Sequence, residues 1–225
     1  MPHMRITFSW MTTTSLAIRT GHAAWAVDAV VRARDGNPEI PGEAVKGAIR
    51  EAAERLLRWY GKLTVREEGS PWFPPTPQLR RIFACDLAGP PGTPHALYKF
   101  NNAVWQPGED RQTVHKMNVS STAIRIGAEI AEDETLRSLE YWKKGIHFAL
   151  SVEGWNGEWS EGTRDFDDLL FLLAAIVSVT AVGGNQGTGS GQVSIDEFAV
   201  DVDGTAVLSK PDILQRLSNW LPEAQ

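Results

Sequence analysis

The stretch "PGEAVKGAIREAAERLLRWYG", residues Pro41 to Gly61, has the clearest periodicity in the chain and sets the frame of the fold. Val45, Ile49 and Leu56 recur at the spacing that brings side chains to one face of an α-helix. Proline suits the first turn of a helix, and glycine commonly ends one. The stretch therefore predicts an amphipathic helix that covers a core with one face.

Five other stretches predict the strands that this helix would cover. Apolar and polar residues alternate in part over residues 5–17 and clearly over residues 146–155. Short strands are also predicted at residues 82–87 and 95–105, and a final strand at residues 191–202.

A second helix is predicted over residues 165–184, "DFDDLLFLLAAIVSVTAVGG", which is apolar nearly all round and begins with acidic residues. Acidic side chains near a helix N-terminus complement the helix dipole, and an apolar circumference indicates burial. With one short strand counted before residues 146–155, the elements follow as strand, helix, strand, strand, helix, strand. That order is the split βαβ arrangement of ferredoxin-like domains, so the predicted fold class is α+β.

We expect residues 1–225 to form a single domain. Its core takes in about residues 4–61 and 144–204, and proline-rich stretches within residues 62–143 indicate an irregular insertion. Residues 205–225 are expected to form a short C-terminal tail.

Composition limits the classes of protein to which the chain can belong. Its 22 Lys and Arg against 28 Asp and Glu give a net charge of −6, which argues against a broad basic field for nucleic acid but permits a local basic groove. The single cysteine, Cys85, excludes an internal disulfide and fits a reducing compartment. Because no apolar run is long enough to cross a membrane, we expect a cytoplasmic protein with no membrane partner.

A second notable stretch is "VGGNQGTGSGQVSI", residues Val182 to Ile195, which lies between the buried helix and the final strand. Consecutive backbone amides in such a loop can form a nest for an anion. No lysine follows, so it is not a Walker loop, and its glycines follow a helix instead of preceding one, so it is not a dinucleotide fingerprint. The alternative interpretation is a flexible connection between helix and strand.

The stretch "GNPEIPGEAVKGAIR", residues Gly36 to Arg50, resembles the signature of the RAMP superfamily of CRISPR-associated proteins, which have RRM-like folds. Glu43 to Val45 stand where the family usually has Ser-Ser-Leu. The resemblance implies that Lys46 contacts guide RNA phosphate and that Gly42 belongs to the RNA-binding site. For Lys46 the alternative is a solvated helix surface.

The glycine-rich stretch is also similar to a loop of this superfamily. The family loop carries two arginines, and this chain has Thr188 or Ser190 and Gln192 in their places. Backbone amides would then make the contacts with RNA. The residues that the resemblance assigns to RNA binding here are Gly183, Gly184, Asn185, Gln186, Gly187, Gly189 and Gly191.

Within the superfamily, the order of motifs is most similar to the repeated backbone subunit of type III effector complexes, in which a loop aspartate is needed to cut target RNA. The loop "HAAWAVDAVVRARD", residues His22 to Asp35, places Asp28 at that position, although the proline that usually follows is absent. Such a carboxylate can recruit a divalent cation, Mg or Mn, to stabilise charge at the phosphate. The alternative role for Asp28 is a turn or capping residue.

His22 is a secondary candidate for chemistry. As a general base it would suit a metal-independent endonuclease that processes CRISPR repeat RNA, another activity of this superfamily. An isolated histidine is more often structural or simply exposed.

Residues 111–142 occupy the position of the family's thumb, a hairpin that lies over the guide RNA. Basic and apolar side chains mix there, which would neutralise phosphates and wedge bases apart. The alternative is a plain surface hairpin. The candidate RNA contacts are Arg111, His115, Lys116 and Arg125.

The sequence thus predicts a subunit that binds guide RNA, cleaves complementary target RNA at Asp28 and assembles with copies of itself or with other CRISPR effector subunits. A subunit that binds RNA without cleaving it remains an alternative, as does the repeat-processing endonuclease. A small-ligand or scaffold protein that binds no RNA is a further alternative from a different class.

Overall fold

The structure of the chain is a computed structural model. It describes nine parts of the chain. They are residues 3–18, 33–59, 77–83, 98–107, 116–121, 137–184, 189–209, 211–212 and 215–216.

An antiparallel sheet forms the centre of the molecule. Its central strands are β1 (His3–Thr12), β8 (His147–Trp155) and β9 (Val193–Val202), with β1 between the other two. On its other side β8 pairs with both β4 (Tyr98–Phe100) and β5 (Ala103–Gln106). Large apolar side chains alternate along β1 and β8 and are buried, as the sequence pattern predicts.

Three short strands extend the sheet at its edges. On one side β10 (Thr205–Ser209) pairs with β9, after a turn in which Asp203 has a positive φ. On the other side β3 (Asn37–Ile40) pairs with β5, and β2 (Ala33–Arg34) pairs with β3.

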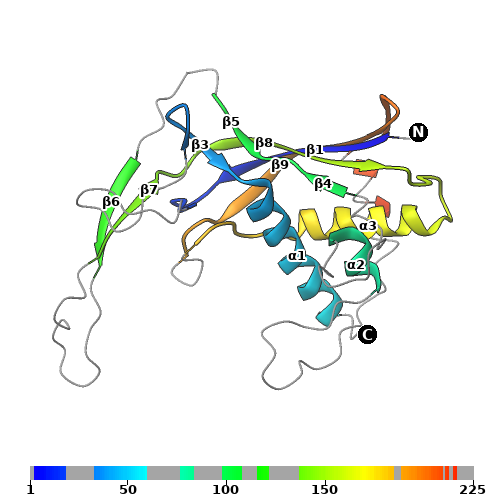
Figure 1. The fold of residues 1–225 in the computed structure, drawn as a ribbon, viewed down its shortest axis with the longest axis horizontal. Helices are drawn as coiled ribbons and strands as arrows, with labels where there is room; N and C mark the ends of the chain where they lie inside the picture. Colours follow the sequence, from blue (N-terminus) through cyan, green and yellow to red (C-terminus); the bar gives the residue numbers. More distant parts are fainter. Residues whose placement is uncertain are drawn as a thin grey trace, which may run out of the picture.

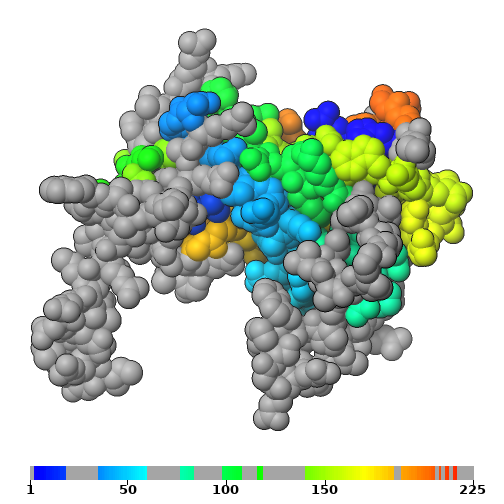
Figure 2. All heavy atoms as spheres, viewed as in Figure 1, coloured from blue at the N-terminus to red at the C-terminus, as the bar shows by residue number. Residues whose placement is uncertain are grey.

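Three helices cover one face of the sheet, and a hairpin protrudes from its end (Figure 1). The helices are α1 (Gly42–Trp59), α2 (Pro77–Phe83) and α3 (Arg164–Val177). In Figure 2, α1 lies in the middle of the helical face with α2 to one side. The hairpin consists of β6 (Lys116–Ser121) and β7 (Arg137–Trp142). No described helix is long and apolar enough to span a membrane.

This arrangement confirms the predicted α+β, ferredoxin-like fold. Along the chain β1 precedes α1, while β4, β5 and β8 lie between α1 and α3, and β9 follows α3. In the sheet these strands lie in the order β9, β1, β8, then β4 and β5, all antiparallel, which is the split βαβ arrangement. The amphipathic stretch that follows Pro41 forms α1, with Val45, Ile49 and Leu56 buried.

Three details of the predicted secondary structure are wrong, and the first is that β1 ends at Thr12 and not at residue 17. The predicted second helix is too long, because α3 ends at Val177 and Ser178 caps it by donating its backbone N–H to the carbonyls of Ala174 and Ala175. The strand predicted at residues 82–87 is wrong where it is described, since Ile82 and Phe83 belong to α2.

The range predicted as an insertion supplies part of the core. Within residues 62–143, α2 buries Leu79, Ile82 and Phe83. Phe83 stacks on Phe100 of β4 with ring centroids 5.7 Å apart. These contacts join α2 to the sheet, so part of this range stabilises the same core as α1 and α3.

Tyr98 of β4 is buried in this core, and its phenol should make the free energy of unfolding depend on pH. Burial, together with the charges of Asp168 and Asp165, raises the pKa of its phenol, and the hydroxyl has no hydrogen-bond partner among the described residues. The folded state thus keeps the proton at pH values where an unfolded tyrosine, with a pKa of about 10, loses it. Stability is unaffected below about pH 10 and falls above it by up to about 1.4 kcal/mol per pH unit.

We therefore expect Tyr98→Phe to weaken this alkaline loss and to raise the free energy of unfolding at neutral pH by about 1 kcal/mol, because a buried hydroxyl without a partner is removed. Urea unfolding at a series of pH values measures both effects. Tyr141→Phe serves as the control tyrosine substitution. An alkaline loss that is equally steep in wild type and Tyr98→Phe would contradict the assignment.

Candidate nucleic-acid interface

β1 leads into a short segment, residues 13–18, that we call the junction segment. The glycine-rich loop and the base of the β6–β7 hairpin are both hydrogen-bonded to it. Residues 19–32, which contain Asp28, follow it directly in the chain. Two stretches that the sequence marks as candidates for function therefore meet at the end of one central strand, and the third begins at the next residue of the chain.

The glycine-rich loop packs its backbone against the junction segment. Gly184 donates its N–H to the carbonyl of Ala17 (2.9 Å), and Gly191 donates to the carbonyl of Ser15 (2.7 Å). A Cβ atom at Gly183, where φ is +90°, would lie 2.7 Å from the Ala17 carbonyl oxygen. These glycines thus allow the loop backbone to lie close to the backbone of the junction segment. Their contact with RNA remains a prediction.

The two arms of this loop are also joined to each other. Val182 donates to the carbonyl of Gly191 (2.8 Å), and Val193 donates to that of Thr180 (3.0 Å). Thr13 then donates to the carbonyl of Gln192 (2.9 Å). The base of the loop is therefore fixed by paired backbone on both sides of residues 185–188.

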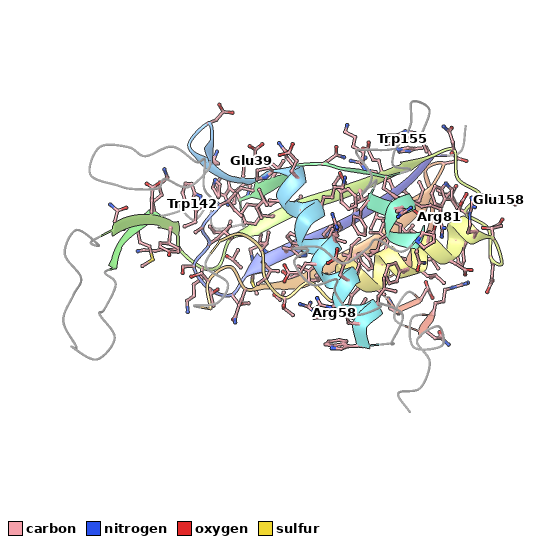
Figure 3. All side chains as sticks on the ribbon, turned by 60° about the horizontal axis from the view of Figure 1, so that its bottom comes forward. Glu39, Arg58, Arg81, Trp142, Trp155 and Glu158 are labelled. Carbon is pink, nitrogen blue, oxygen red and sulfur yellow. The ribbon has the colours of Figure 1, made fainter. Side chains whose placement is uncertain are left out.

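The hairpin is attached to the same segment through Trp142. Leu16 and Trp142 exchange two backbone hydrogen bonds of 2.9 and 2.8 Å. Trp142 is buried and lies where the hairpin meets the sheet (Figure 3). Lys116 is engaged within the hairpin, since its Nζ lies 3.3 Å from Glu140 Oε2 and 4.9 Å from the centroid of the Trp142 ring. Much of its charge is therefore compensated internally, and its contact with RNA remains a prediction.

The cations of α1 differ in their availability. Arg50 pairs with Glu54 (2.8 Å), and Arg55 donates to the carbonyl of Ser178 (2.6 Å) at the end of α3. Lys46 is half-buried and has no ion pair with any residue in the described ranges. No described acidic residue therefore competes for Lys46, and its contact with RNA phosphate remains a prediction.

Packing explains why residue 42 is a glycine. A Cβ atom there would lie 2.2 Å from the carbonyl oxygen of Phe100, at the end of β4. The Gly42 N–H, at the start of α1, donates to Asn102 Oδ1 (2.8 Å), and Asn102 in turn donates to Glu39 (2.9 Å). The position is used for packing and helix capping within the chain, and a role in RNA binding remains a prediction.

On the sheet face away from the helices, the described middle positions of the central strands carry no aromatic side chain, and the exposed Trp155 lies beside His3 at the end of β1 and β8. A row of four charged residues runs across β4, β8, β1 and β9 in register, with alternating sign: Lys99, Glu153, Arg5 and Asp201. In the next row Thr7 pairs with Ser151. RRM domains stack bases on aromatic residues of the central strands. Because these central positions carry small and mutually neutralising side chains, the candidate interface lies at the junction segment instead.

Eight of the candidate residues lie outside the described residues, and their assignments stay predictions. They are His22, Asp28, Arg111, His115, Arg125, Asn185, Gln186 and Gly187. Within the part of the chain that is described, no group of three His, Cys, Asp or Glu side chains could hold a metal ion. The divalent cation predicted with Asp28 is thus a matter for experiment.

The sequence reasoning missed the junction segment, because the strand was predicted to continue to residue 17. In the structure β1 ends at Thr12, whose carbonyl accepts from Gly145 (2.8 Å) and whose hydroxyl accepts from Ile146 (2.9 Å). The sequence signal was the run of threonines in "TTTS", residues 12–15, where polar residues interrupt the alternation.

Fold and site together define a ferredoxin-like α+β protein whose loops and protruding hairpin converge at one end of the central strand. A family model, described as the RAMP superfamily, matches residues 12–194. The chain belongs to this superfamily, which confirms the family that the "IPG" and glycine-rich motifs predict.

The solved structures support the same fold. One that the chain resembles is described as "Type III-B Cmr-beta Cryo-EM structure of the Apo state". The match has a TM-score of 0.59 and 11% sequence identity, and it covers 85% of this chain and 96% of that one. At this identity the likeness concerns the fold. None of the curated proteins matches the chain.

Proposed function

We propose that this chain is a subunit of a type III CRISPR effector complex that binds guide RNA and cleaves complementary target RNA. The observation that carries the proposal is the convergence at the junction segment. The glycine-rich loop and the β6–β7 hairpin, both similar to RNA-binding parts of the superfamily, are hydrogen-bonded to residues 13–18. The stretch with the candidate aspartate begins at the next residue.

Binding would combine three supports for the RNA backbone. Lys46 supplies a cation on α1, the hairpin supplies an elongated surface, and the glycine-rich loop supplies backbone amides above its paired base. The partners are guide and target RNA and either copies of this chain or other effector subunits. The resemblance to a chain from a type III-B Cmr-beta structure supports an assembly of this kind.

Cleavage would proceed by attack of the target RNA's 2′-hydroxyl on the adjacent phosphorus. The 5′-oxygen leaves and a cyclic phosphate remains. This reaction needs the 2′-hydroxyl proton to be removed and negative charge to be stabilised at the phosphate. We assign the second of these tasks to the Asp28 carboxylate, which would hold a divalent cation that stabilises the charge at the phosphate when bound.

The test is Asp28→Ala in the complex loaded with guide RNA. We expect cleavage of complementary RNA to fall about 10²-fold, the lower end of what the loss of one charge-stabilising group costs, with target affinity unchanged. Gel analysis of labelled target gives the rate, and filter binding gives the affinity. Wild-type cleavage should also stop in EDTA and return with Mg or Mn.

Asp35→Asn is the matched control. Asp35 belongs to the same stretch of sequence but lies in the β2–β3 turn at φ +52°, which asparagine tolerates, so cleavage should be unchanged. Unchanged cleavage in Asp28→Ala would refute the catalytic assignment. Target binding without any cleavage would favour a binding-only subunit, and cleavage that persists in EDTA but is lost in His22→Ala would favour repeat processing. Purified protein without bound RNA and without affinity for it would favour the scaffold alternative.

A further inference from the structure

The turn between β7 and β8 carries two lysines that no sequence motif assigns. Lys143 and Lys144 directly follow Trp142, and both are exposed. Gly145 then closes the turn at φ +86° and donates its N–H to the carbonyl of Thr12 (2.8 Å). The next residue, Ile146, donates to the Thr12 hydroxyl (2.9 Å). The turn is therefore fixed against the end of β1.

This anchoring places the lysines at the candidate interface. Trp142, the residue before them, is hydrogen-bonded to Leu16, and the neighbouring carbonyls of Ser15 and Ala17 hold the glycine-rich loop. Consecutive Cα atoms are about 3.8 Å apart. The two side chains thus arise within one or two residues of the contact that joins the hairpin to the junction segment.

The charges near this turn leave both lysines available. Glu140 pairs with Lys116 (3.3 Å) on the hairpin, and Asp196 lies 3.5 Å from His147 Nδ1. Lys143 and Lys144 form no ion pair with any described residue. In a chain with a net charge of −6, two adjacent, exposed cations on a fixed turn, without an ion pair among the described residues, are a local basic site.

We infer that Lys143 and Lys144 bind backbone phosphates of the RNA that lies across the junction segment. The inference rests on the proposed RNA-binding function and extends it to this turn. Glu140 competes with phosphate for Lys116 on the hairpin. The two lysines of the β7–β8 turn would therefore make phosphate contacts close to the base of the hairpin. Phosphate contacts position the RNA and carry no sequence information, so the site would accept any sequence.

Binding of a labelled single-stranded RNA of mixed sequence by the full chain, measured over a range of KCl concentrations, tests the inference. Each released counterion contributes to the slope of log K against log salt, about 0.7 per phosphate contact for single strands. We expect Lys143→Ala and Lys144→Ala each to reduce the slope by about 0.7 and to weaken binding roughly 3- to 10-fold, equally across RNA sequences. The Lys→Arg variants should retain wild-type binding.

Lys99→Ala is the control, because Lys99 is an exposed lysine on β4 that stands in register with Glu153 on the far sheet face. Its slope should equal that of wild type. If wild type binds RNA and the two turn variants keep its slope, this inference fails while the proposed function stands. If wild type binds no RNA, both fail. If the Lys143→Ala and Lys144→Ala variants bind RNA like wild type but no longer co-purify with partner subunits, the turn makes a protein contact and the inference is overturned.

Discussion

Replacing Arg81 by alanine is expected to lower the free energy of unfolding by about 3–5 kcal/mol, the cost of breaking a buried ion pair from one side. The Arg81 guanidinium contacts both carboxylate oxygens of Asp168, with Nε to Oδ2 at 2.6 Å and Nη2 to Oδ1 at 2.7 Å. The Asp168 side chain is 1% exposed, so in the variant its charge would lack both this partner and water. The pair also joins α2 to α3, at the end of the molecule far from Trp142 (Figure 3).

Thermal and urea unfolding measure the effect, which corresponds to a fall in Tm of roughly 6–20 °C at about 2–4 °C per kcal/mol for a chain of this size. Arg80→Ala removes an exposed arginine from the same helix and should change stability by about 0.5 kcal/mol or less. The double variant Arg81→Met, Asp168→Leu should recover most of the loss, because apolar side chains can replace a buried pair. A loss below about 1 kcal/mol in Arg81→Ala would show that the pair is well screened by solvent, and would leave α2 held mainly by its apolar contacts.

Local patterns were sufficient to predict the long strands β1, β8 and β9 and the two long helices, because burial on one face imposes a period that can be read along the chain. They failed at the end of α3. Val179 and Val182 are buried like the helical residues before them, but they lie beyond the helix. An apolar run records burial and not backbone conformation, so the sequence could not show where the helix gives way to the loop.

The glycine-rich loop shows a different limit. Its glycines predicted either a nest for an anion or a flexible connection, whereas in the structure Gly184 and Gly191 donate to carbonyls of Ala17 and Ser15, far away in the sequence. Nothing in the loop itself distinguishes an intramolecular neighbour from a ligand. Similarly, the cation at Lys116 was visible, but its partner Glu140 depends on the register of the hairpin. Lys143 and Lys144 were missed because they fall between the predicted thumb and the next strand.

Gly191→Ala tests whether the glycine-rich loop needs its glycine for packing within the chain or for contact with RNA. We expect this substitution to destabilise the RNA-free protein by about 3–5 kcal/mol. A Cβ atom at this position would lie 2.0 Å from the Val182 carbonyl oxygen, and φ is +76°. The left-handed backbone alone costs about 1–2 kcal/mol for alanine. Relief of the clash would further strain the hydrogen bonds that Gly191 makes with Val182 (2.8 Å) and Ser15 (2.7 Å).

Gly189→Ala is the matched control, because its φ of +81° carries the same backbone cost while its Cβ would meet no atom within 4 Å. It should destabilise by about 1–2 kcal/mol, and the difference between the two variants in urea unfolding measures the close approach alone. If Gly191 serves the fold, its variant is less stable than the control before any RNA is added. If the two variants are equally stable without RNA and only Gly191→Ala loses RNA affinity, the glycine serves RNA binding instead. A side chain at residue 191 would then clash with the bound RNA backbone and not with the protein.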